Sequence, residues 1–81
     1  MEFKHPQFPR ISVNPEICFG KPRVAGTRMP VSSILSYLSS GMTVEEFLTE
    51  FKNLTKEDVM EAMAFASVMM EDKFLPLDKA S

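Results

Sequence analysis

Cysteine, histidine and glycine are scarce in this 81-residue sequence, which contains one cysteine, one histidine and three glycines. A single cysteine cannot form an internal disulfide, which fits a reducing compartment. No apolar run approaches the roughly 20 residues that span a bilayer, and the first residues lack the apolar stretch of a signal peptide. We therefore expect a cytoplasmic protein that does not associate with a membrane.

The same scarcity leaves little material for a catalytic or metal site. The only histidine, His5, lies beside a proline in a segment predicted to be irregular, where nothing would fix a general base. A metal site needs several clustered ligands, and we interpret Cys18 as a small buried apolar residue. The glycines lack the spacing of a phosphate or dinucleotide loop. We expect no enzyme activity, no cofactor and no metal.

The segment 20–31 holds two of the three glycines, two of the six prolines and three of the nine basic residues. Glycine permits backbone angles that other residues avoid, and proline fixes φ, so this composition predicts a tight β-hairpin. Its sides would be residues 23–24 and 28–29, and its turn residues 25–27. Upstream we expect a short strand at Ile11–Val13, and a turn that faces Phe19 inward.

Three helices are predicted after the hairpin. The first, at residues 31–40, carries one apolar stripe and stops at Gly41. The second runs from Thr43 to about residue 51, and the third from Thr55 to about residue 72. Each of these two begins with a threonine followed three residues later by an acid, the pattern of a capping box. The short connection between them is typical of a helix-turn-helix.

The predicted fold is therefore mainly α. A small N-terminal β-strand and hairpin precede a three-helix bundle of helix-turn-helix-like, homeodomain-like architecture. We expect an N-terminal arm at residues 1–10, a single domain at residues 11–72 and a C-terminal tail at residues 73–81.

The predicted third helix is apolar on nearly all of its faces, and the tail that follows it is apolar as well. A helix of this kind is normally buried on all sides. Two short helices and a hairpin cannot cover it, so we expect a homodimer or another protein partner. The candidate interface residues are Phe65, Val68, Met69, Phe74, Leu75 and Leu77.

Charge is distributed unevenly between the two halves of the chain. Residues 1–40 carry five basic and two acidic residues, and residues 41–81 carry four basic and nine acidic residues. An anionic partner should therefore meet the N-terminal half, through the hairpin more than through the acid-rich start of the third helix. For Arg23 and Arg28 we weigh two roles equally. Each could contact a nucleic acid, or each could stabilise the fold by bonding to the end of a helix or to an acidic side chain. The candidate nucleic-acid-binding residues are Lys21, Arg23, Thr27 and Arg28.

Three stretches of the sequence form a recognisable pattern. Residues 14–31 end in Gly-Thr-Arg-Met-Pro-Val, residues 41–47 read Gly-Met-Thr-Val-Glu-Glu-Phe, and residues 53–66 contain Leu-Thr-Lys-Glu-Asp-Val. Over about residues 11–67 this resembles the signature of a widespread prokaryotic family of domains of unknown function, number 433. The chain departs from the family pattern where an acid, a proline and a tyrosine are usual, at Asn14, Lys52 and Phe65.

The resemblance implies a compact helical domain akin to homeodomain-like helix-turn-helix folds. Members are often encoded beside a PIN-like ribonuclease, and the family is viewed as antitoxin-like. The leading hypothesis is a binding module that neutralises such a ribonuclease. As a dimer, the protein would also bind operator DNA. The alternatives are a stand-alone DNA-binding transcriptional regulator, a structural oligomerisation domain and, more remotely, a hydrolase.

Overall fold

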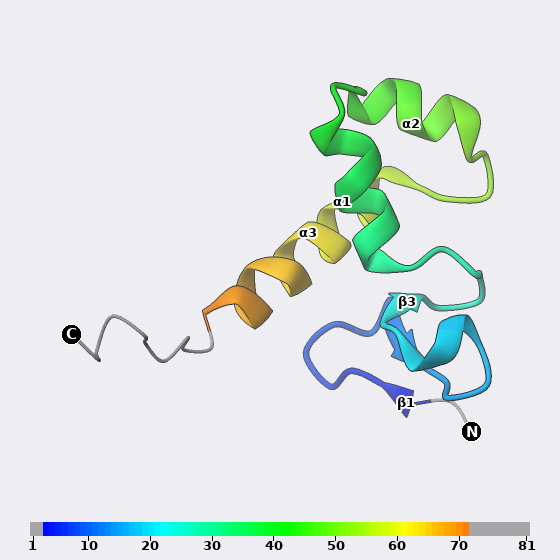
Figure 1. Cartoon of the computed structure of the whole chain (residues 1–81), viewed down its shortest axis with the longest axis vertical. Coiled ribbons are helices and arrows are strands. Elements are labelled where there is room, and N and C mark those ends of the chain that lie inside the picture. Colours follow the sequence, from blue (N-terminus) through cyan, green and yellow to red (C-terminus); the bar gives the residue numbers. More distant parts are fainter. Residues whose placement is uncertain (1–2, 72–81) are drawn as a thin grey trace.

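The computed structural model describes residues 3–71, and it places a small sheet at one end of a three-helix domain (Figure 1). This arrangement confirms the mainly α fold with an N-terminal β element. A short 3-10 turn, η1, lies between the second and third strands. The elements in chain order are β1 Phe3–Lys4, β2 Ile11–Val13, η1 Cys18–Gly20, β3 Arg23–Val24, α1 Val31–Ser39, α2 Val44–Glu50 and α3 Lys56–Met70.

The sheet has three antiparallel strands in the order β1-β2-β3. β1 pairs with β2 so that Phe3 lies opposite Val13, and β2 pairs with β3 so that Ile11 lies opposite Val24. The expectation of an irregular arm at residues 1–10 is therefore wrong for β1. Phe8, also in that stretch, packs against the hydrophobic core. The N-terminal segment is part of the domain, because its strand pairs with β2 and the Phe8 ring packs against Phe65 of α3.

The predicted hairpin is present. The Val24 amide donates to the Met29 carbonyl at 2.9 Å, and the Thr27 amide donates to the Val24 carbonyl at 3.1 Å. Gly26 has a φ of 80°, the positive value that the third position of a type II turn requires. The hairpin ends at Pro30, which pairs with β3 and is the N-cap of α1.

Both predicted capping boxes are confirmed. At α2 the Thr43 amide donates to Glu46 Oε1 at 2.9 Å, and at α3 the Thr55 amide donates to Asp58 Oδ2 at 2.9 Å. Asp58 does more than cap its helix, because Arg10 Nη1 donates to its other carboxylate oxygen at 3.0 Å. This ion pair fastens the segment before β2 to the first turn of α3.

We expect Asp58→Ala to lower the free energy of unfolding by about 2–3 kcal/mol, because it removes half of a capping box and the nearer of the two carboxylates that pair with Arg10, the other being Glu61. Glu46→Ala removes the equivalent cap without an ion pair, and should cost about 1 kcal/mol. Urea denaturation of both variants gives the difference. That difference should shrink in about 1 M salt, because Arg10 is partly exposed and the pair is screened. Equal losses for the two variants would contradict this role for Arg10.

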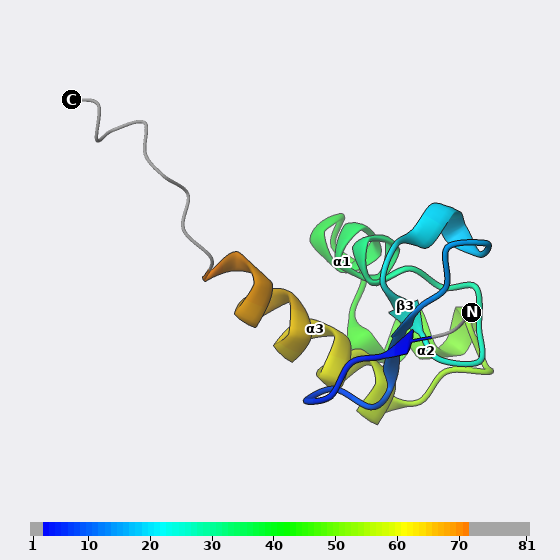
Figure 2. The same cartoon turned by 90° about the horizontal axis from the view of Figure 1, so that it is seen from below.

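The core lies where the sheet and the three helices meet. Phe47 of α2 is fully buried, and its ring lies 4.8 Å from that of Phe51 and 5.8 Å from that of Tyr37. α3 adds apolar side chains from one face only, while its C-terminal half extends beyond the other elements in both views (Figures 1 and 2). The buried apolar residues are Ile11, Val24, Val31, Ile34, Phe47, Leu54, Val59, Ala62 and Phe65.

Candidate functional site

Two of the four predicted nucleic-acid-binding residues hold the hairpin together. Arg23 is only 2% exposed, and its Nη1 donates to the Thr27 carbonyl at 2.6 Å. The Thr27 hydroxyl donates to the Val24 carbonyl at 2.8 Å and accepts from the Met29 amide at 3.0 Å. Arg23 therefore has the structural role. The prediction that it contacts a nucleic acid is wrong, because its side chain is buried.

Lys21 and Arg28 remain at the surface, and both are exposed. Lys21 follows η1 directly, and Arg28 lies on the returning side of the hairpin. The Cys18 thiol donates to the Arg28 carbonyl at 3.4 Å, so η1 and the hairpin are held against each other. The two cations therefore belong to adjoining loops at the sheet end of the domain.

Phe19, at the centre of η1, is 97% exposed, so the expectation that it faces inward is wrong. Cys18, Phe19 and Gly20 have φ values of 55°, 56° and 78°, so three consecutive residues are left-handed. Only glycine adopts this region without steric cost, and two of the three are not glycine. The sequence contains no signal for this conformation, which turns the aromatic ring away from the core.

Replacing Phe19 with glycine should raise the free energy of unfolding by about 1 kcal/mol, because glycine removes the Cβ clash at positive φ. Little packing is lost, since the ring is almost fully exposed. Thermal unfolding of the wild type and of Phe19→Gly is the appropriate comparison. A lower melting temperature in the variant would show that the phenylalanine contributes to stability after all.

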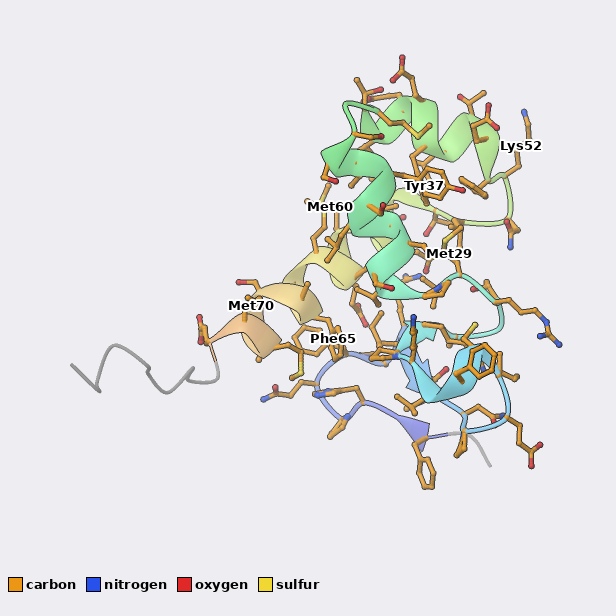
Figure 3. The ribbon with its side chains drawn as sticks, in the orientation of Figure 1. Met29, Tyr37, Lys52, Met60, Phe65 and Met70 are labelled. Carbon is orange, nitrogen blue, oxygen red and sulfur yellow. The ribbon has the colours of Figure 1, made fainter. Side chains whose placement is uncertain are left out.

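An apolar groove lies between α1 and the C-terminal half of α3. Its volume is about 320 Å³, and apolar side chains form most of its walls. Val31 and Leu35 line it from α1, while Met69 and Met70 line it from the last turn of α3. Figure 3 shows Met70 at that end of the helix. The full lining consists of Lys21, Pro22, Val31, Ser32, Leu35, Phe65, Ala66, Met69 and Met70.

The predicted interface residues lie in different places relative to this groove. Phe65 is 6% exposed, and its ring packs edge-on against His5 and Phe8, so it is a core residue and not a free contact residue. Val68 and Met69 are 39% and 41% exposed. The other three predicted interface residues lie outside the described part of the chain: Phe74, Leu75 and Leu77.

α3 exposes more apolar surface than the predicted interface residues account for. Met60, Met63 and Met70 are 45%, 39% and 67% exposed. The expectation that the rest of the domain cannot cover this helix is confirmed for its described residues. The residues that the prediction missed are all methionines of α3, and they lie at helical positions that the rest of the described chain leaves partly uncovered.

Within residues 3–71, no three histidine, cysteine or acidic side chains are grouped as a metal site would require. The same residues include no helix long and apolar enough to cross a bilayer. His5 packs its ring 5.0 Å from Phe8 and 5.5 Å from Phe65, and its Nδ1 accepts from the Gln7 amide. This histidine joins the N-terminal segment to α3.

A sequence profile of the family described as protein of unknown function (DUF433) matches residues 11–66. No protein with a curated description matches the chain. Among solved structures, a DUF433 member protein from Anabaena variabilis ATCC 29413 is similar, with a TM-score of 0.73 and 31% identity. The match covers 76% of this chain and 61% of that one. On the profile match, which extends over more than half of its length, the chain belongs to the DUF433 family.

Proposed function

We propose that this protein is an antitoxin-like binding module that neutralises a PIN-like ribonuclease partner. The observation that carries the proposal is the apolar groove between α1 and α3. Its walls include Leu35, Met69 and Met70, which are 38%, 41% and 67% exposed. Exposed apolar side chains gathered around one hollow are typical of a surface that another protein covers.

The side chains at this groove suit a protein partner. Methionine is unbranched and polarisable, so Met69 and Met70 can adapt to the shape of an incoming side chain. A few well-buried apolar contacts of this kind carry most of the affinity of a protein interface. Capture of a partner by such contacts needs no catalytic group.

The charge of the helical half supports the same kind of partner. Residues 41–81 carry four basic and nine acidic residues, including the exposed Glu45 and Glu57 in the first turns of α2 and α3. A ribonuclease must attract the phosphates of RNA and therefore presents a positively charged surface. This protein, with its acidic helical half and its apolar groove, would complement such a surface in both charge and hydrophobicity. The pair would form in the cytoplasm, where the RNA substrate is found.

Neutralisation can be tested by expressing the product of the adjacent gene alone and together with this protein. The proposal predicts that the neighbour stops growth when expressed alone, that co-expression restores growth, and that the two proteins co-purify in a fixed ratio. A harmless neighbour that does not co-purify would contradict the proposal.

A stand-alone DNA-binding regulator is the second candidate. It is favoured by exposed Lys21 and Arg28, which lie on adjoining loops in the more basic half of the chain. A mobility shift with the DNA upstream of its own gene, without any partner protein, would support it. DNA binding through Lys21 and Arg28 is also compatible with an antitoxin that binds its operator as a dimer. The mobility shift therefore does not distinguish the two functions, and the growth assay does.

A further inference from the structure

We propose that Phe19 stacks on a nucleic-acid base while Lys21 and Arg28 contact the flanking phosphates. This inference rests on the nucleic-acid-binding part of the proposed function and is independent of the ribonuclease partner. It identifies the residue that would meet the bases.

The conformation of η1 indicates that Phe19 does not serve the fold. Its ring is 97% exposed, so its burial contributes almost nothing to stability. Its φ of 56°, next to a φ of 55° at Cys18, is unfavourable for residues with a Cβ. Backbone strain at a surface residue with no packing role is characteristic of binding sites.

The turn is nevertheless held firmly. The Gly20 amide donates to the Ile17 carbonyl at 3.1 Å, and the Lys21 amide donates to the Cys18 carbonyl at 3.0 Å. The Cys18 thiol adds the bond to the Arg28 carbonyl at 3.4 Å. A ring presented on a fixed turn loses less conformational freedom on binding than one on a loose loop.

The charged groups around Phe19 select the partner. Lys21 follows it by two residues, Arg28 lies on the loop bonded to Cys18, and both are exposed. Glu16, just before η1, is an exposed acid. With one acid against the two cations Lys21 and Arg28, the charge around Phe19 is net positive. An aromatic ring beside cations matches a base beside its phosphates, because stacking is apolar and phosphate contacts are ionic.

Tryptophan fluorescence can report the contact directly, because the sequence contains no tryptophan. In Phe19→Trp, the indole is the only one in the protein and stands where the ring is almost fully exposed. We expect its emission to be quenched on titration with an oligothymidine of about 20 nucleotides or a duplex of about 20 base pairs, because bases stack on the indole. Comparing the two probes shows whether single strands or duplexes supply the base.

Affinity measurements separate stacking from charge. Phe19→Ala should weaken binding about tenfold and leave the salt dependence unchanged, because stacking involves no counterion release. Arg28→Ala should weaken binding and reduce the slope of log K against log salt by about 0.7–0.9. Phe3→Ala is the matched control, since Phe3 is 55% exposed on β1, and it should bind as the wild type does.

Each outcome bears on a different part of the account. Wild-type binding with no quenching in Phe19→Trp and full affinity in Phe19→Ala would overturn the stacking role and leave nucleic-acid binding intact. No binding of either probe at low salt would overturn both, while the ribonuclease partner would still be tested by growth. A blue-shifted, brighter indole on adding the adjacent gene's product, with no response to nucleic acid, would make Phe19 a protein contact and overturn the inference.

Discussion

Replacement of Phe47 by alanine is expected to lower the free energy of unfolding by about 3–5 kcal/mol. The side chain is 0% exposed and lies against the rings of Tyr37 and Phe51, so alanine leaves a cavity that α1 and α2 cannot close without moving. Small domains are stable by only about 5–15 kcal/mol, so this one change removes a large fraction of the total.

Phe19→Ala is the control for Phe47→Ala, because it deletes the same atoms from a side chain that is 97% exposed. Its effect on unfolding should lie within about 0.5 kcal/mol of zero. Urea denaturation followed by circular dichroism measures both. If the two variants lost similar amounts of unfolding free energy, the burial of Phe47 would not be what holds the helices together.

Met69→Glu is expected to weaken the complex with the ribonuclease partner at least 100-fold, or about 2.7 kcal/mol. Met69 lines the groove and is 41% exposed, so glutamate would place a charge where an apolar side chain of the partner has to be buried. Isothermal titration calorimetry with the product of the adjacent gene gives the dissociation constant. Thermal unfolding of the variant alone shows that the fold is retained.

Met60→Glu is the matched control for the groove. Met60 lies on the same helix, is 45% exposed and does not line the groove. The same change of methionine to glutamate should leave the affinity within a few-fold of the wild type. If Met60→Glu weakened the complex as strongly as Met69→Glu, the partner would cover the other face of α3, and the groove would not be the docking site.

The sequence predicted well those features that depend on local chemistry. Thr43 and Thr55 begin their helices as expected, because a capping box involves only residues within one turn of each other. The hairpin at Gly26 follows from the same principle, since a turn with positive φ needs glycine at a fixed place.

Features that depend on the path of the backbone, and that no residue type signals, could not be predicted. β1 has only two residues, and it forms because β2 offers an edge on which it can pair. Arg23 looked like a surface cation, yet its side chain is buried in the hairpin, where the guanidinium donates a hydrogen bond to the Thr27 carbonyl. Phe19 looked like a core residue because it is apolar, and only the left-handed turn shows that it points to solvent.

The central claim is that the groove between α1 and α3 is covered by another protein. Hydrogen–deuterium exchange, measured with and without the product of the adjacent gene, tests it most directly. The account predicts slower exchange in the C-terminal half of α3 and at the start of α1, which carry Met69, Met70 and Val31. Protection confined to the sheet end of the domain, with α3 unchanged, would contradict it.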